Sequence, residues 1–253
     1  MLRSMHVILV AAVLLSVRAA VGQGLYWEVQ TTGVSDKPQT ARAYAVPKKM
    51  KVISEDGKVM LLRGDQEKFY LIDPSKRVYH EFTLAQLEQG AKATRSQQDA
   101  ALEQMRKQLP NLPAEERAQL EKQLEKMGGA EQSVHVAVKS TGETKKILGR
   151  TCTKSVATSG SETILVAWTT KDIKGLDALR EDWLNYQKRF ASLGRAPGGL
   201  ADAYGKLDGF PMETQVGSVK NEVVKIEPRK IPSSEFDVPT GYTNEVLPMP
   251  GQK

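Results

Sequence analysis

The chain has 253 residues, of which 36 are Lys or Arg and 30 are Asp or Glu, and its formal net charge is +6. Basic and acidic residues are interleaved, and no long basic run occurs. The chain therefore lacks the basic patch that is typical of a nucleic-acid-binding protein. Cys152 is the only cysteine, so no intramolecular disulfide can form.

The first 22 residues predict a secretory signal peptide. Arg3 precedes an apolar run over residues 7–17, and small residues end the segment at Gly22. Such a run is shorter than the roughly 20 residues that a membrane helix needs. We therefore expect a soluble exported protein, periplasmic or extracellular, whose mature chain begins near Gln23. Arg18 is unusual between the apolar run and the small residues, and it leaves the exact cleavage site open. The alternative is an N-terminal anchor that is not cleaved. No cysteine lies at the end of the signal segment, where a lipid would be attached, so we do not expect a lipoprotein.

The next segment predicts an antiparallel meander. Apolar and polar residues alternate from Leu25 to Gln30, which places Leu25, Trp27 and Val29 on one face of a strand. Further short runs rich in β-forming residues follow, separated by turn sequences such as Glu55-Asp56-Gly57. These expected strands cover residues 50–53, 59–63, 69–73 and 77–82.

Residues 83–129 predict a helical hairpin inserted between strands. Thr83 and Gln86 have the spacing of a capping box, and leucines then recur at helical spacing. Pro110 and Pro113 interrupt this pattern. A second helix is expected from Pro113 to the glycine pair at Gly128.

Strands resume after the insert. The expected strands cover residues 133–139, 151–156 and 163–170, an amphipathic helix with an aromatic stripe covers 176–190, and a closing hairpin covers 210–217 and 219–228. Residues 243–253 read as a flexible tail. The order of elements favours a single α+β domain over residues 23–242, built on a curved antiparallel sheet with helices packed over one face.

Groups able to carry out chemistry are few. His80 and His135 have no neighbours at metal-ligand spacing, and no phosphate loop, dinucleotide fingerprint or nucleophile elbow occurs. Cys152 lies in an expected strand and is interpreted as a buried thiol, with pairing to a cysteine of another chain as the alternative. We therefore predict no catalytic residue, no metal site and no cofactor.

The expected meander is richer in large apolar residues than a sheet with one solvated face requires. Ile53, Val59, Leu61 and Ile72 occupy one face, so both faces should be covered. One interpretation is an ordinary α+β core. The other is a curved sheet around an apolar cavity for a lipid-like ligand. The lining predicted for that cavity comprises Met50, Val52, Met60, Leu62, Phe69 and Leu71 on the strands, and Trp183 on the later helix.

Several short motifs resemble an exported bacterial family, domain-of-unknown-function family 4412. They lie between about Leu25 and Tyr242 and include Lys48-Lys49-Met50-Lys51-Val52, Lys68-Phe69-Tyr70-Leu71-Ile72-Asp73, Leu112-Pro113-Ala114-Glu115-Glu116-Arg117, Lys146-Ile147-Leu148-Gly149-Arg150-Thr151-Cys152, Gly209-Phe210-Pro211-Met212 and Phe236-Asp237-Val238-Pro239-Thr240-Gly241-Tyr242. That family is in turn similar to the LolA and LppX type of lipoprotein carrier. The resemblance implies a half-barrel closed by helices over an apolar cavity, and it implies no catalytic residues.

These observations leave three functional hypotheses. The first is a non-enzymatic envelope protein that binds a lipid, an acyl chain or an envelope partner. Such a protein could also contact the membrane surface peripherally. The second is an interaction module whose insert docks a partner protein. The third is a hydrolase with a site assembled from distant residues, which the shortage of His and Cys makes the weakest. The sequence does not indicate an oligomeric state.

Overall fold

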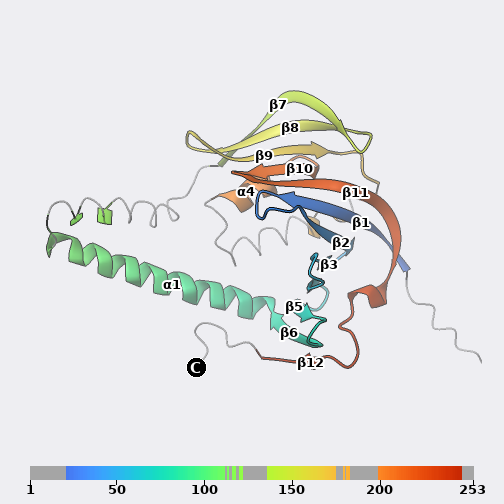
Figure 1. Cartoon of the computed structure of the whole chain (residues 1–253), viewed down its shortest axis with the longest axis horizontal. Helices are drawn as coiled ribbons and strands as arrows, with labels where there is room; N and C mark the ends of the chain where they lie inside the picture. The colour runs from blue at the N-terminus through green and yellow to red at the C-terminus, as the bar shows by residue number, and fades with distance from the viewer. Residues whose placement is uncertain are drawn as a thin grey trace, which may run out of the picture.

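The computed structural model describes residues 21–111, 113, 116–117, 120–121, 136–174, 179, 181–182 and 199–246. Within them, twelve strands form one sheet in the order β12-β6-β5-β4-β3-β2-β1-β11-β10-β9-β8-β7 (Figure 1). All pairings are antiparallel except that of β12 with β6. The protein is thus a mixed α+β structure that consists mostly of sheet.

Two meanders make up this sheet, apart from the short edge strand β12. The first contains β1 (Val21–Thr32), β2 (Gln39–Val46), β3 (Lys49–Ile53), β4 (Val59–Arg63), β5 (Lys68–Asp73) and β6 (Val78–Thr83). The second contains β7 (Val136–Ile147), β8 (Arg150–Ser159), β9 (Glu162–Thr170), β10 (Phe210–Val216) and β11 (Val219–Pro232). A long ladder between β1 and β11 joins them, from Val21 opposite Pro232 to Thr32 opposite Lys220.

Strand β1 bears on the predicted signal peptide. Residues 1–20 lie outside the described part, whereas Val21 and Gly22 pair with Pro232 and Ile231. Cleavage before Gln23 would therefore remove the first two residues of the strand and leave ten in the ladder. No helix in the described ranges is both long and apolar enough to cross a membrane.

The first helix of the predicted insert is present as α1 (Leu84–Gln108), followed by the 3₁₀ turn η1 (Leu109–Asn111). The Thr83 hydroxyl accepts a hydrogen bond from the Gln86 backbone amide, and the Gln86 side chain accepts one from the Thr83 amide. This reciprocal cap begins the helix as predicted. In Figure 1 α1 extends away from the end of β6. Most of the second predicted helix, residues 113–129, and of the later one, residues 176–190, lies outside the described residues.

The short helix α4 (Leu200–Gly205) packs on the second meander. Ala203, which is fully buried, contributes to a cluster with strand residues that include Val136 and Leu165. The Tyr204 hydroxyl donates to Thr214 Oγ1 at 3.2 Å. No sequence pattern had indicated this helix, because six residues are too few to show a helical repeat.

The C-terminal segment covers the first meander. The 3₁₀ turn η2 (Ser233–Phe236) buries Phe236 completely against a cluster that includes Leu61, Tyr70 and Ile72. Thr243 and Asn244, assigned to a flexible tail by the sequence, form β12 and pair with β6.

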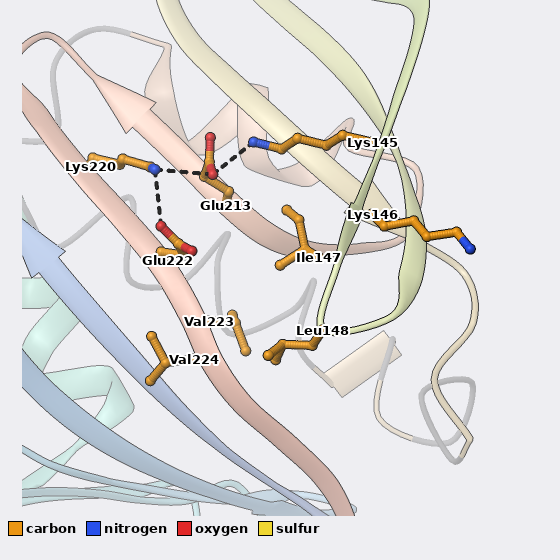
Figure 2. Close-up of a pocket in the computed structure, with 9 residues that line it drawn as sticks. All are labelled: Lys145, Lys146, Ile147, Leu148, Glu213, Lys220, Glu222, Val223 and Val224. Atoms are coloured by element: carbon orange, nitrogen blue, oxygen red, sulfur yellow. Dashed lines mark hydrogen bonds and ion pairs between the residues drawn. The ribbon is translucent and has the colours of Figure 1, made fainter.

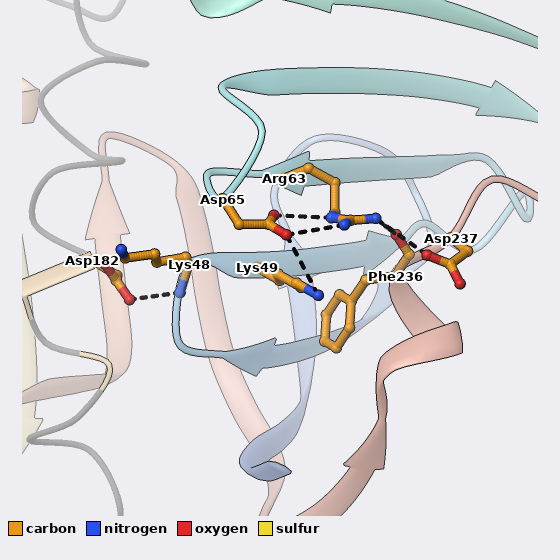
Figure 3. A network of polar contacts seen from close by, with 7 residues as sticks. All are labelled: Lys48, Lys49, Arg63, Asp65, Asp182, Phe236 and Asp237. Atoms are coloured by element: carbon orange, nitrogen blue, oxygen red, sulfur yellow. Dashed lines mark hydrogen bonds and ion pairs between the residues drawn. The ribbon is translucent and has the colours of Figure 1, made fainter. Parts of the chain in front are cut away.

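Arg63 binds the C-terminal segment at Phe236 and Asp237, as Figure 3 shows. Its guanidinium donates two hydrogen bonds to the Asp65 carboxylate, both at 2.9 Å, and further bonds to Phe236 O and Asp237 Oδ1, both at 3.1 Å. The hydrogen bonds from Arg63 lower the pKa of Asp65 despite its partial burial. In the hairpin between β2 and β3, the Lys48 backbone amide donates to Asp182 Oδ2 at 2.7 Å.

Candidate functional site

The six strand residues predicted to line a cavity do share one face of the sheet. Strand register places Met50 opposite Leu62, which lies opposite Phe69, and it places Val52 opposite Met60, which lies opposite Leu71. Residues directly opposite each other, and residues two apart on one strand, point to the same side. We call this set of six residues the meander face. Trp183, the seventh predicted residue, lies outside the described residues.

Burial changes across the meander face. Leu62 and Phe69 are 2% and 7% exposed and pack with Phe82 and Leu84, where α1 begins. Met50, Val52 and Leu71 are half-buried. Met60 is 48% exposed, although paired strands flank it on both sides. The face is therefore closed beside α1 and open at Met60.

The reverse side of the same strands is closed. Val59, Leu61 and Ile72 are at most 9% exposed and belong to the cluster under Phe236. Both faces of the meander are thus apolar, and the chain itself covers one of them with its C-terminal segment. The open position at Met60 is an apolar surface without an equivalent cover among the described residues.

A separate pocket of about 360 Å³ lies between the end of β7 and the start of β11 (Figure 2). Its lining is aliphatic at one end and charged at the other. The aliphatic end consists of Ile147, Leu148, Val223 and Val224, and the charged end of Lys145, Lys146, Glu213, Lys220 and Glu222.

The charged end is a chain of ion pairs. Glu213 binds Lys145 at 2.8 Å and Lys220 at 3.2 Å, and Lys220 also binds Glu222 at 3.0 Å. Glu213 and Glu222 lie directly opposite each other in the register, so without Lys220 their like charges would repel. Burial opposes the ionisation of Glu213, but its two lysine partners outweigh burial and lower its pKa.

Lys145 has a second contact that orients it. Its ammonium lies 4.3 Å from the ring centroid of Trp168, a cation–π geometry. Trp168 in turn lies opposite Lys154 in the register. The charged groups other than Lys146 therefore satisfy one another, and this arrangement indicates positioning of β7 against β10 and β11 more than acid–base chemistry. Sequence reasoning missed these pairs because Lys145 and Glu213 are far apart in the chain.

The remaining candidate groups neither belong to the meander face nor line the pocket. Cys152 is fully buried, as predicted, in a cluster that includes Trp27 and Met212, and burial raises the pKa of its thiol. His80 Nδ1 lies 2.6 Å from the carbonyl oxygen of Glu245. His135 lies outside the described residues. Among the residues described, no three His, Cys, Asp or Glu side chains gather where they could hold a metal ion.

Two solved structures are similar to this chain at low identity. An uncharacterized conserved protein from Thermus thermophilus has 8% identity and a TM-score of 0.47, over 89% of this chain and 91% of that chain. The structure of PNGF-II has 12% identity and a TM-score of 0.38, over 89% of this chain and 31% of that chain. Neither similarity is high enough to support a conclusion about the fold or the function.

No curated protein sequence matches the chain. A family model does match, with the description "Domain of unknown function (DUF4412)", over residues 116–242. The match covers the second meander and the turn η2, whereas β1 to β6 and β12 lie outside it. Since it spans half of the sequence, the chain belongs to the DUF4412 family.

Proposed function

We propose that this protein is an exported, non-enzymatic binding or carrier protein for an apolar or lipid-like ligand in the cell envelope, and that the ligand lies on the meander face. In this proposal the sheet is a half-barrel of the lipoprotein-carrier type, and helices close over its apolar side. The signal-like N-terminus supports export to the periplasm. The observation that carries the proposal is the exposure of Met60 on an apolar face whose other members are buried or half-buried.

Two physical arguments support a ligand at this position. First, Val52, Met60 and Leu71 form one cross-strand row, so an apolar ligand at Met60 would extend along neighbouring apolar side chains. Second, methionine is flexible and polarizable, which suits a surface that must adapt to ligands of different shape. A filled core would gain more from a branched residue with fewer rotamers.

The direct test uses protein purified from its native host. Native mass spectrometry should detect an apolar molecule of defined mass that leaves when the protein is denatured. Recovery of ligand-free protein, together with an experimental structure in which the interior beside Met60 is filled by side chains, would reject the proposal.

A variant pair locates the site. N-phenyl-1-naphthylamine, whose fluorescence rises in apolar surroundings, serves as the probe in solution without lipid. Met60→Glu introduces a charge on the meander face and should weaken probe binding at least tenfold. The bound probe would cover the new carboxylate, and burying a carboxylate without a partner is strongly unfavourable. Val246→Glu is the matched control, since Val246 is an exposed apolar residue of the C-terminal segment at 88% exposure. Equal binding by both variants would place the site elsewhere.

One observation keeps a second function in consideration. Helix α1 extends from the sheet in Figure 1, and Met105 on it is 36% exposed. A helix with an apolar position far from its own core is a way to dock a protein partner. Met105→Glu should then abolish co-purification of one defined envelope protein, and unchanged co-purification would leave the ligand-binding function as the better proposal.

A further inference from the structure

The β7–β8 hairpin has an apolar residue at its tip where the backbone favours a polar one. The loop contains two residues, Leu148 and Gly149, between the paired Ile147 and Arg150. Both loop residues have positive φ, 48° and 77°. Two-residue hairpin loops of this kind favour Asn-Gly, because a bulky side chain is strained at positive φ.

Leu148 differs from the other residues with this backbone conformation. Among the described residues, the other non-glycines with positive φ are Lys48, Glu67 and Arg77, all charged and suited to solvent. Leu148 is 46% exposed, so packing does not explain its side chain. A strained residue whose side chain the fold does not need is a sign of function.

A second exposed apolar residue lies beside the tip. Val224 is 39% exposed and lines the same pocket as Leu148. Across the ladder to β1, Val223 pairs with Val29 and Lys225 with Glu28, so Val224 is the extra residue of a β-bulge. Bulges redirect side chains at the margins of sheets. Leu148 and Val224 are thus two exposed apolar residues, from different elements, that line one pocket.

Positive charge flanks the apolar residue at the tip. Arg150 donates to the carbonyl oxygens of Leu148 at 3.3 Å and of Asp172 at 3.0 Å, so its guanidinium is held at the tip by backbone groups. In Figure 2 the Lys146 ammonium points away from the Glu213 ion pairs. The carboxylate of Glu213 is already engaged by Lys145 and Lys220. The cations of Lys146 and Arg150 therefore lie outside that network.

We propose that the β7–β8 tip docks the protein on an anionic lipid surface, with Leu148 inserted among the acyl chains and Lys146 and Arg150 at the phosphate level. An exposed apolar residue gains by entering the bilayer boundary, and each nearby cation gains from the negative surface potential. One tip of this size gives weak, reversible binding. That suits a protein that must leave the membrane again, and the docking goes beyond the proposed ligand binding without requiring it.

Leu148→Asn tests the apolar contact without harming the fold. Asn-Gly is the preferred sequence for the turn, so this variant should be at least as stable as the wild type. Binding is measured by co-sedimentation with vesicles of phosphatidylcholine, with or without phosphatidylglycerol. Every variant has the same N-terminus, so any contribution of the first 22 residues is common to all. Val34→Asn, which changes a residue 62% exposed in another hairpin, is the matched control.

The expected result is that the wild type binds the anionic vesicles and that Leu148→Asn lowers its partition coefficient about tenfold, while Val34→Asn leaves it unchanged. Lys146→Gln should lower the coefficient about fivefold. Lys139→Gln, an exposed lysine earlier on the same strand, should have a much smaller effect.

Three outcomes would overturn the docking proposal. They are no binding of the wild type to anionic vesicles, equal binding to neutral vesicles, and equal losses for Leu148→Asn and Val34→Asn. Because the Met60 probe assay contains no lipid surface, failure of docking and failure of ligand binding are separate results.

Discussion

Removal of the Phe236 ring is the perturbation that most directly tests how the C-terminal segment holds the first meander. Phe236 is fully buried against Leu61, which is 1% exposed, and it forms the largest fully buried side chain of the described residues. Phe→Ala in a core typically costs about 3–5 kcal/mol, because the lost burial adds to the cavity that remains. We expect the upper part of this range, since Arg63 binds Phe236 O and limits collapse of the segment into the cavity.

The assay is urea unfolding followed by tryptophan fluorescence. Phe236→Ala should lower the free energy of unfolding by about 4 kcal/mol with an unchanged slope on urea concentration. Val246→Ala, at a position 88% exposed, should change it by less than about 0.5 kcal/mol. A loss below about 1 kcal/mol for Phe236→Ala would refute the reasoning, because it would mean that the segment is not part of the cooperative unit.

Three further predictions concern single groups. Hydrogen bonds from Arg63 lower the pKa of Asp65 in the folded protein, so the contribution of Asp65 to stability is complete above its ordinary pKa of 3.8 and is lost as pH falls through the folded pKa. Asp65→Asn should therefore flatten the decline of the free energy of unfolding in acid, measured by urea unfolding at a series of pH values. An unchanged decline would contradict this. Gly209→Ala should destabilise the protein by more than Gly57→Ala in thermal unfolding, because a Cβ at Gly209 would lie 2.7 Å from a backbone oxygen while one at Gly57 meets nothing within 4 Å, and φ is positive at both. Cys152 should react with a thiol reagent only in denaturant, and rapid reaction of the native protein would show that the thiol is accessible.

The sequence predicted the elements whose signals lie within a few neighbouring residues, namely the faces of β1 and of β3 to β5 and the start of α1. The alternation around Trp27 gives the two faces of β1, and the register confirms the shared face of the six residues on β3 to β5. The reciprocal hydrogen bonds of Thr83 and Gln86 follow directly from their spacing. In each case the signal lies within a few residues and needs no knowledge of distant partners.

Strand β2 was missed because its inward positions are small. Ala43 and Ala45 lie opposite Trp27 and Leu25, so large side chains of β1 occupy the space over them. Alanine has little preference for strands, and the two β-branched residues of the segment, Thr40 and Val46, lie near its ends. The period-two alternation of alanine with Arg42 and Tyr44 was the available signal.

The candidate site was predictable only in part. The meander face could be read from alternation, but the exposure of Met60 depends on what covers each strand in three dimensions. The pocket beside Leu148 requires the curvature that brings β7 near β11, strands that are not neighbours in the sheet. Contacts between such distant segments carry no periodic signal in one sequence.

The two proposed surfaces belong to different meanders, and this separation has a mechanical consequence. Met60 lies on β4, whereas the docking tip joins β7 to β8, and the long β1–β11 ladder connects the two halves. A ladder of this length is a stiff connection, because each pair of strands is held by repeated backbone hydrogen bonds. Under the two proposals, a ligand on the meander face would therefore be presented toward a membrane at a fixed orientation when the tip docks. Binding and docking would then be coupled by geometry alone, without any change in conformation.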